Sequence, residues 1–197
     1  MPKVVNHEER RREIAVAVEQ VVHEQGVSEV TIRTIAKRLG CSPSIISYYF
    51  PSKLDMLVFT HKLIRSNSEE RLLKALEQGG DAISSFEMLL PTDEATWRDW
   101  HMFFAFWGLA PTEHYVTVEW AEAASEAHAI FRRIIERAQD HGAIDCRIDP
   151  AELATKVQVA INGIASLVAQ SRSQWPAQRQ RATFRELFGA LLVSDTP

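Results

Sequence analysis

The chain has 197 residues, enough for one medium domain or for a small domain joined to a larger one. Its hydrophobic content of 46% is typical of a globular protein that can bury a substantial core. The formal net charge of −4 excludes a protein whose whole surface attracts nucleic acid, although it is compatible with a local basic face.

Cysteine usage and hydropathy predict a location inside the cell. Cys41 and Cys146 are the chain's two cysteines, too few for a disulfide framework, and they suit a reducing cytosol. The N-terminus is polar and charged, unlike a secretory signal, and no apolar run approaches the roughly 20 residues that span a bilayer. We therefore expect a cytoplasmic protein without a membrane partner.

Charge is unevenly distributed along the chain. Residues 1–65 hold ten Lys and Arg against seven Asp and Glu, whereas the remainder holds twelve against nineteen. The basic excess therefore falls in the N-terminal third. A split of this size is common by chance, so by itself it adds little weight to any assignment.

Helical spacing and helix-stop residues recur from the N-terminus onward, and no strand-like alternation is sustained. A first helix is expected to end at Gly26. A second begins after the N-cap Thr31 and stops at Gly40. A third and a fourth helix are expected over about residues 42–50 and 53–78.

Five further helices are predicted over about residues 83–89, 95–109, 112–141, 149–172 and 176–193. The expected fold class is therefore all-α, with about nine helices. The first three helices form a small head, residues 1–55, and the rest form a larger helical body, residues 56–197.

The stretch from Thr31 to Lys53 reads as two short amphipathic helices joined by a tight turn. A helix-turn-helix uses this arrangement to place its second helix in the DNA major groove. Ile46, Tyr49 and Phe50 form the inward face of that helix. Its outward residues are short or flat, which suits close approach to base edges. They are Pro43, Ser44, Ile45, Ser47 and Tyr48.

Further groups around this helix suit the DNA backbone and one base edge. Arg33 can reach a guanine edge, and Lys53 can hold a phosphate. The hydroxyls of Tyr48 and Tyr49 and the backbone N–H groups at Ser42 suit phosphate oxygens. The alternative interpretation is an ordinary surface helix in an unrelated bundle, because short helix pairs with glycine turns are common.

The same residues resemble the N-terminal signature of the TetR family of bacterial one-component regulators. The resemblance covers roughly residues 10–57 and rests on TIRTIA at 31–36, GCS at 40–42 and YYFPSK at 48–53. It implies an all-α homodimer whose N-terminal helix-turn-helix binds a palindromic operator and whose C-terminal domain binds a small molecule. Matched position by position, it implies DNA contacts at Thr31, Arg33, Pro43, Ser44, Ile45, Ser47, Tyr48, Tyr49 and Lys53.

Ser47 departs from the pattern of many family members, which have tyrosine at this place. The string Ile45-Ile46-Ser47-x-Tyr49-Phe50 is similar to the BetI subgroup, the choline-responsive repressors of glycine-betaine synthesis. Trp97-x-x-Trp100 and Phe106-Trp107 are similar to that subgroup as well. This second resemblance implies the architecture of the subgroup more than its ligand.

Seven aromatic residues are candidates for an effector site: Trp97, Trp100, Phe103, Phe104, Trp107, Tyr115 and Trp120. Four of them, at 100, 103, 104 and 107, fall on one face of the sixth predicted helix. Such a stripe is most often plain core, and that interpretation stays open. The other interpretation is a pocket wall, where aromatic faces attract a quaternary ammonium by roughly 0.5–2 kcal/mol per ring. Carboxylates that can supply a counter-charge are Asp99, Glu113, Glu119 and Glu122.

Two apolar stripes near the C-terminus are candidates for a homodimer interface of two-fold symmetry. The stripe on the eighth predicted helix comprises Val157, Ala160, Ile161, Ile164, Ala165 and Val168, with Asn162-Gly163 permitting close approach. The stripe on the ninth comprises Phe184, Leu187, Phe188 and Leu191. Part of each stripe must instead be internal core.

These observations predict a repressor that binds a palindromic operator as a dimer and is released by a small molecule, choline being one candidate. An activator or an architectural DNA-binding protein of the same fold is the alternative. An enzyme is not expected, because the chain has no Gly-rich phosphate loop, His-Glu-x-x-His motif or nucleophile elbow. The grouping of His141, Asp145 and Cys146 is too weak for a metal site, and no cofactor is expected.

Overall fold

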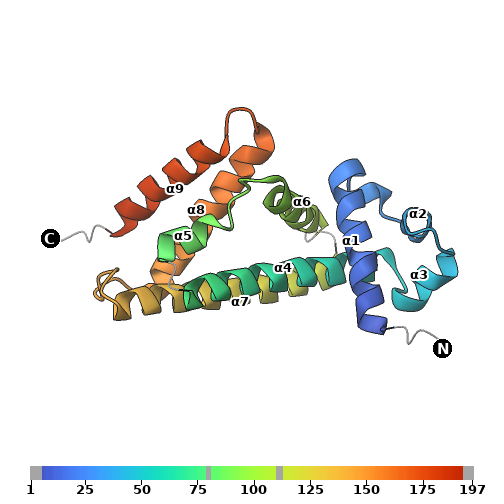
Figure 1. Ribbon diagram of the computed structural model, residues 1–197, viewed down its shortest axis with the longest axis horizontal. Helices are drawn as coiled ribbons and strands as arrows, with labels where there is room; N and C mark the ends of the chain where they lie inside the picture. Colours follow the sequence, from blue (N-terminus) through green and yellow to red (C-terminus); the bar gives the residue numbers. More distant parts are fainter. Residues whose placement is uncertain (1–5, 79–80, 110–112, 193–197) are drawn as a thin grey trace. The chain divides into compact units, whose positions relative to one another are not determined.

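The computed structural model describes residues 6–78, 81–109 and 113–192, with side chains of the last helix up to Gly189. Within these ranges every regular element is helical, as the sequence predicts (Figure 1). The elements are α1 (His7–Gln25), the 3-10 helix η1 (Val27–Glu29), α2 (Ile32–Arg38), α3 (Pro43–Tyr49), α4 (Lys53–Glu77), α5 (Ala82–Glu87), α6 (Glu94–Leu109), α7 (His114–Asp140), α8 (Pro150–Gln170) and α9 (Ala177–Leu192).

The helix starts follow from the capping residues. Thr31 caps α2, since its hydroxyl accepts a hydrogen bond from the backbone N–H of Thr34 at 3.0 Å. Ser52 and Asp55 cap α4 reciprocally, because each side chain accepts a hydrogen bond from the backbone N–H of the other. Asp149 caps α8 with a 2.8 Å bond from the N–H of Ala151. These polar groups set where each helix begins.

Some predicted boundaries need correction. α5 ends at Glu87, and not at Leu89, because the N–H groups of Met88 and Leu89 bond to carbonyls three residues back in tighter turns. The 3-10 helix η1 was not predicted, and it fills the connection between α1 and α2. Thr112, the predicted start of the seventh helix, lies outside the described residues, and α7 begins at His114.

The chain divides into two compact units. The first comprises residues 1–67 and 98–120, and the second comprises residues 68–97 and 121–197. α4, α6 and α7 therefore each contribute residues to both units. The first unit extends beyond the predicted head of residues 1–55, because it also takes in the first part of α4, most of α6 and the start of α7. A functional boundary after residue 55 stays a prediction.

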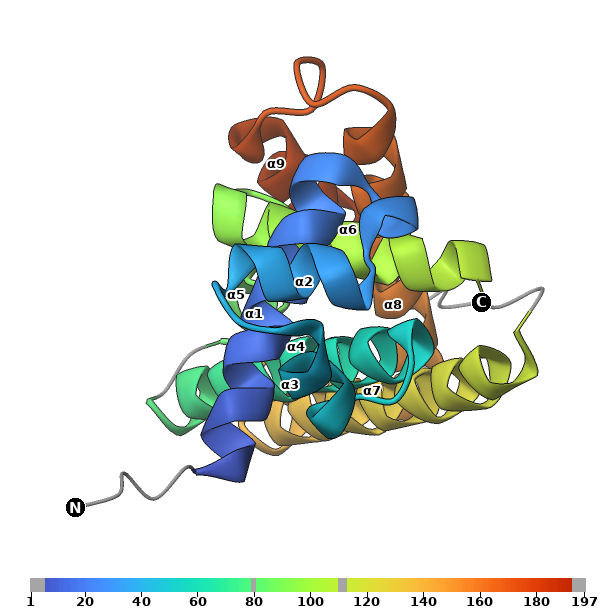
Figure 2. The same cartoon turned by 90° about the vertical axis from the view of Figure 1, so that its right-hand side faces the viewer.

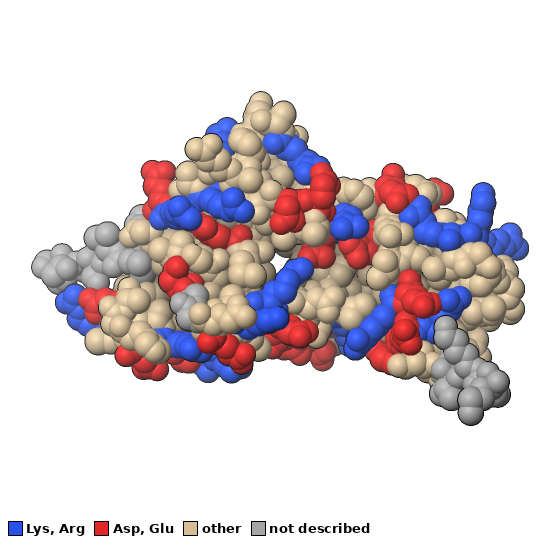
Figure 3. Space-filling model, viewed as in Figure 1, with Lys and Arg blue, Asp and Glu red and all other residues tan. Residues whose placement is uncertain are grey.

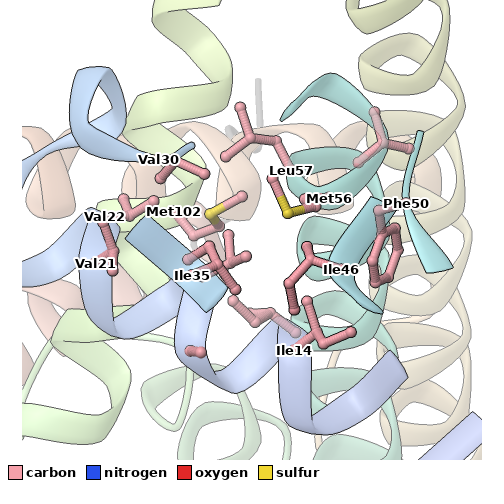
Figure 4. Packing of buried hydrophobic residues seen from close by; sticks show 14 of the residues in the cluster. Ile14, Val21, Val22, Val30, Ile35, Ile46, Phe50, Met56, Leu57 and Met102 are labelled. Atoms are coloured by element: carbon pink, nitrogen blue, oxygen red, sulfur yellow. The ribbon is translucent and has the colours of Figure 1, made fainter. Parts of the chain in front are cut away.

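The first unit has a continuous apolar core that fixes α3. Figure 4 shows side chains from α1, α2, α3, α4 and α6 converging on it, among them Ile14, Ile35, Ile46, Phe50 and Met102. Figure 2 looks onto α1, α2 and α3 together. Ile46, in the middle of α3, is fully buried in this core. The recognition candidate α3 is thus held by Ile46 on its inner face, with Tyr49 and the following Phe50 packed on the same core.

The second unit packs the end of α7 against α5, α8 and α9. Phe86 of α5 lies at its centre, with ring contacts to Phe131, Phe184 and Phe188. The carboxylate of Glu87, itself buried, accepts hydrogen bonds from the guanidinium of Arg185 on α9. α5 and α9 are therefore joined by both apolar and charged contacts.

Most residues of the two predicted dimer stripes belong to this internal core. Fully or almost fully buried within the single chain are Val157, Ile161, Ile164, Ala165, Val168, Phe184 and Phe188. Because the single chain already buries these side chains, they do not lie on the outer surface of α8 and α9. Leu187 is exposed, Ala160 is half-buried, and the Leu191 side chain lies outside the described residues.

The length and hydropathy of a helix decide whether it can span a membrane. Within the described ranges, no helix combines the length and the apolar character needed to cross a bilayer.

Candidate functional site

The start of α3 is built to present a short, flat surface. Pro43 occupies the first helical position, where its missing N–H leaves no bond unmade, and Ser42 before it has extended backbone geometry. The Ser42 side chain makes no capping bond to the helix, and its hydroxyl lies 2.8 Å from that of Ser44. Ser42 and Ser44 are both exposed at the tip of the helix.

The ten candidate DNA-binding residues share one accessible region of the first unit. Eight of them are exposed: Thr31, Arg33, Ser42, Pro43, Ser44, Ile45, Ser47 and Tyr48. Tyr49 and Lys53 are half-buried, and the Lys53 ammonium donates to the carbonyl of Ser28 at 3.3 Å. Figure 3 shows Lys and Arg side chains over the α1–α3 region, at the right of the view, with acidic groups beside them.

A hollow of about 410 Å³ lies along α3, lined by Arg10, Ser44, Ile45, Tyr48 and Tyr49. The Arg10 guanidinium donates to the Glu13 carboxylate at 2.6 Å, and this bond raises the pKa of Arg10. Arg10, on the α1 side of the hollow, is thus protonated and paired with Glu13.

Two residues of α1, His7 and Arg10, were missed by sequence reasoning. The His7 ring lies 6.0 Å from the Tyr48 ring and 5.7 Å from the Tyr49 ring. Nothing in the local pattern of α1 indicates these contacts, because they depend on how α1 packs across α3. They add two side chains with basic nitrogen to the candidate surface.

Polar contacts fix α2 against α1 and so position Arg33. The Arg38 guanidinium donates to Glu24 of α1 at 2.9 Å and to Gln20 at 3.2 Å. Its pairing with Glu24 raises the pKa of Arg38 and lowers that of Glu24. Arg33 lies on the exposed side of α2, where the structure leaves its side chain open to solvent.

Five of the seven candidate effector residues meet in the first unit. Trp100 contacts Phe103 and Phe104, with both ring-centre distances 5.5 Å. Trp107 lies edge-on to Phe104 at 5.4 Å and edge-on to Trp120 of α7 at 5.5 Å. Edge-to-face contacts of this kind are a favoured aromatic arrangement.

Trp97 and Tyr115 do not join this group. Trp97 belongs to the second unit, where the Arg172 guanidinium covers its ring at 5.0 Å from the centre. Tyr115 is exposed on the first turn of α7. Trp97 and Tyr115 were grouped with the other five because they are close in sequence, but Trp97 lies in the other unit and the Tyr115 side chain is exposed.

The aromatic stripe of α6 is not the most buried face of that helix. Met102 and Phe106 are fully buried. Of the stripe, Trp100 is buried as well, at 6% exposed, whereas Phe103, Phe104 and Trp107 keep part of their surface exposed. The core of the first unit is therefore filled by Met102 and Phe106. The stripe thus has one buried and three partly exposed members, and its role as pocket wall or plain core stays a prediction.

A buried histidine from α4 lies in the same group of rings, and sequence reasoning missed it. The His61 ring stacks on Phe106 with centres 4.2 Å apart, and it lies edge-on to Phe103 at 5.4 Å. Burial, reinforced by the positive charges of Arg65 and Lys62, lowers the pKa of His61 to about 4. His61 is therefore neutral at physiological pH.

The predicted counter-charges are only partly suited to a bound cation. Glu119 is buried beside the rings, but its carboxylate already pairs with the Lys62 ammonium at 2.7 Å. Glu113 and Glu122 are exposed. Of the described residues, no three His, Cys, Asp or Glu side chains gather closely enough to hold a metal ion.

Two family models match the chain. The model of bacterial regulatory proteins of the tetR family matches residues 14–58, the region of the helix-turn-helix. The model of the BetI-type transcriptional repressor C-terminal part matches residues 84–193, which is more than half of the chain.

The chain is similar to known regulators over part of their length. The chain is similar to HTH-type transcriptional regulator PksA of Bacillus subtilis (strain 168), with 32% identity over 110 residues and 54% of each protein covered. It is 38% identical to HTH-type transcriptional regulator BetI of Escherichia coli (strain K12 / DH10B) over 82 residues, 40% of this chain and 42% of that protein. The matched part thus spans about half the length of these relatives, or less.

A solved structure shares the fold. A transcriptional regulator from Saccharomonospora viridis in complex with choline has a TM-score of 0.80 and 23% identity, with 92% of this chain and 96% of that chain covered. At this identity the likeness shows the fold alone. The two family models show more, and by them the chain belongs to the TetR family of bacterial regulatory proteins, with a C-terminal part of the BetI type, a family of transcriptional regulators and not of enzymes.

Proposed function

We propose that the protein is a cytoplasmic transcriptional repressor that binds a palindromic operator as a homodimer and is released by a small molecule. One observation carries the DNA-binding part. On the inner face of α3 Ile46 is 0% exposed, while the residues on its outer face are open to solvent. A helix held from behind in this way can present its short side chains to the major groove.

The DNA-facing groups divide into two kinds. Ser44, Ser47 and the methyl groups of Ile45 suit base edges, because serine bonds to several bases and an apolar group can touch a thymine methyl. Lys53, Tyr49 and Arg10 suit phosphates around them. Two such helices, related by the dimer axis, would enter major grooves roughly 34–36 Å apart.

The proposed dimer uses the outer faces of α8 and α9, since their inner faces are core. Val159, Gly163 and Leu167 recur every four residues along α8 and are exposed. A side chain added at Gly163 would meet nothing within 4 Å, so a partner helix can approach closely there. Leu187 and Gly189 are exposed on α9. Two such helices from each chain would make a self-complementary four-helix interface.

Replacement of both Leu167 and Leu187 by glutamate is expected to dissociate the dimer. Four carboxylates would then enter one apolar interface, and the dimer dissociation constant should rise at least a hundredfold, roughly the effect of losing two interface anchors. Sedimentation velocity over a concentration series measures this constant. Val16→Glu is the matched control, because Val16 is 49% exposed, like Leu187 at 43%, but lies on α1. Equal dimerisation of the double variant and the control would contradict this interface.

The effector part of the proposal rests on the aromatic rings between α4, α6 and α7. The choline bound by the Saccharomonospora viridis relative supports a ligand that aromatic faces attract. α4 links the two sites directly, since it begins at the DNA side with Lys53 and carries His61 among the rings. α6 has a second connection, because His101 Nδ1 lies 2.9 Å from His23 Nδ1 on α1.

A ligand that moves α4 or α6 would therefore move the DNA-binding surface. A shift of about 1–3 kcal/mol in operator binding is enough for regulation of this kind.

Operator binding is tested first, with a site selected from random DNA duplexes and confirmed by footprinting upstream of the gene. Arg33→Ala should weaken binding about 10–100-fold through loss of one base contact, and Ser44→Glu should weaken it further by charge repulsion. Fluorescence anisotropy at a fixed salt concentration measures both constants, because such affinities depend steeply on salt.

The control variants have the same types of substitution, Arg to Ala and Ser to Glu, on a helix far along the chain from α3. Arg133→Ala and Ser125→Glu alter exposed residues of α7 and should bind the operator like the wild type. If Arg33→Ala and Ser44→Glu bind as well as these controls, the proposed docking is wrong. A footprint overlapping the promoter supports repression, whereas one upstream of it, with transcription stimulated, would indicate an activator. Wrapping of DNA without a defined binding site would indicate an architectural protein.

A further inference from the structure

His23 of α1 and His101 of α6 face each other within the first unit. Their Nδ1 atoms are 2.9 Å apart and their ring centres 4.7 Å apart, although the residues are 78 positions apart in sequence. Both side chains are half-buried. Met102, which follows His101, is fully buried in the apolar core that α1 also enters. The two histidines therefore make a polar contact beside a packed boundary between α1 and α6.

The geometry of this contact allows one hydrogen between the two Nδ1 atoms and not two. A neutral imidazole carries its hydrogen on one ring nitrogen, so one Nδ1 can donate to the other. The same hydrogen bond forms when one ring is protonated, and the charge then strengthens it. When both rings are protonated, both Nδ1 atoms carry a hydrogen and two positive charges face each other, so the contact becomes repulsive. Imidazole ordinarily titrates at about pH 6.5, so this change falls in mild acid.

Charged groups of α1 and α6 lie near the pair. Glu19 precedes His23 by one helical turn, and its carboxylate lies 3.9 Å from the guanidinium of Arg98 on α6. Burial raises the pKa of Glu19, and the negative charge of Asp99, two residues before His101, adds to this effect, whereas Arg98 opposes it. Two carboxylates and one guanidinium give these groups a summed charge of −1.

α2 adds one further ion pair beside His23. The Glu24 carboxylate of α1 accepts a hydrogen bond from the Arg38 guanidinium of α2 at 2.9 Å. This bond lowers the pKa of Glu24, and the charge of His23 adds to the effect. Glu24 and Arg38 cancel in charge, so the groups near the two histidines still sum to −1. One proton on the pair is therefore balanced, whereas a second proton is not.

We propose that His23 and His101 form a proton-operated link between α1 and α6. The link holds while at least one of the two rings is neutral, and it opens when both are protonated. It controls one of the connections between the proposed effector region and the DNA-binding surface, so its regulatory meaning rests on the proposed function. Its titration does not rest on that function, because both residues belong to the first unit of a single chain.

An NMR titration of the histidine rings in the full-length protein reads the pair directly. The rings of His23 and His101 should take up their protons in two steps at least about one pH unit apart, as coupled groups do. In His23→Asn and in His101→Asn, the remaining histidine should titrate in a single step. Asparagine keeps an acceptor oxygen but does not titrate, so it can accept a hydrogen bond from a neutral or a protonated ring.

A double-mutant cycle measures the strength of the link. The wild type, His23→Ala, His101→Ala and the double variant are unfolded with urea at pH 7.5 and at pH 5. At pH 7.5 the coupling should be about fivefold in the unfolding equilibrium constant, the usual net effect of one hydrogen bond. At pH 5 it should fall below about twofold, because the second proton then opposes the contact.

His128 provides the matched control, because it is a half-buried histidine that joins two helices of the second unit. Its Nε2 lies 3.0 Å from the carbonyl oxygen of Ala151 and 3.1 Å from the hydroxyl of Thr155. A carbonyl oxygen only accepts, so Nε2 must donate, and a protonated ring donates equally well. In the same cycle, the coupling of His128 with Thr155 should therefore be as large at pH 5 as at pH 7.5.

Two results would overturn the proposal. One is a single protonation step shared by His23 and His101, and the other is a coupling between them that is equally large at pH 5 and at pH 7.5. Failure of the proposed function has a different signature. The wild type would then bind no operator at either pH, while the two protonation steps of the pair would remain.

Discussion

Replacement of Phe50 by alanine is expected to lower the free energy of unfolding by about 3–5 kcal/mol, the usual cost of emptying a buried phenylalanine site. Phe50 follows α3 directly and is 1% exposed in the core of the first unit. Its ring lies 5.3 Å from that of Phe59 on α4. Removal of the ring therefore leaves a cavity where the end of α3 meets α4.

The loss includes an interaction with a half-buried cation. The Arg11 guanidinium of α1 lies 4.9 Å from the centre of the Phe50 ring and 4.4 Å from that of Phe59. Arg11 Nε is buried and finds no hydrogen-bond partner among the described residues, so the two rings are its main neighbours. Without Phe50, one of the two ring faces that stabilise this charge disappears. α1, α3 and α4 then lose a common contact.

Urea denaturation of Phe50→Ala, followed by circular dichroism, measures the change in unfolding free energy. Tyr48→Ala is the matched control, since Tyr48 is two residues away but 71% exposed, and its change should stay within about 0.5 kcal/mol. The two variants should separate stability from recognition, because Tyr48→Ala should weaken operator binding while leaving the fold intact. A loss below about 1 kcal/mol for Phe50→Ala would mean that the contact between α3 and α4 is not cooperative.

Much of the head can be predicted from sequence because its signals are local. Thr31 and Pro43 act on the first turn of the helix that they precede or begin, so capping preferences identify both starts. The buried position of Ile46 follows from helical spacing within seven residues of α3. The same spacing puts the exposed candidates on the other face.

The effector region was harder to predict because its contacts join distant parts of the chain. His61 lies on α4, more than forty residues before Phe103, and no local pattern relates a lone histidine to an aromatic stripe on another helix. The stripe itself was predicted, but spacing alone cannot tell which neighbouring face, that of Phe106 or that of Phe104, enters the core. Packing of α4 and α7 against α6 decides this.

The dimer stripes show the same limit of periodicity. The pattern on α8 correctly identifies an apolar face, yet Val157 and Ile161 of that face are buried in the core of the same chain. The exposed residues Val159 and Leu167 alternate with them and are fewer and more widely spaced. An apolar stripe in a sequence says that a face is buried, but not whether the same chain or a second copy buries it.

His61 should make the stability of the protein fall as the pH is lowered from 6.5 to 4. Its pKa is about 4 in the folded chain, because of burial and then the charges of Arg65 and Lys62, against an ordinary value of 6.5. Between these values the unfolded chain binds more protons than the folded one, so acid favours unfolding. Relative to pH 7.5, the contribution of His61 should be a loss of about 2 kcal/mol at pH 5 and about 3 kcal/mol at pH 4.

Comparison with His61→Phe isolates this contribution from the carboxylates that also titrate in acid, such as Glu19, whose pKa is raised by burial. Urea denaturation of both proteins at pH 7.5, 6, 5 and 4 should show the variant gaining on the wild type by those amounts. Phe59→Leu, an apolar change in the same core, should differ from the wild type by a constant at every pH. A constant difference for His61→Phe as well would mean that folding does not lower the pKa of His61.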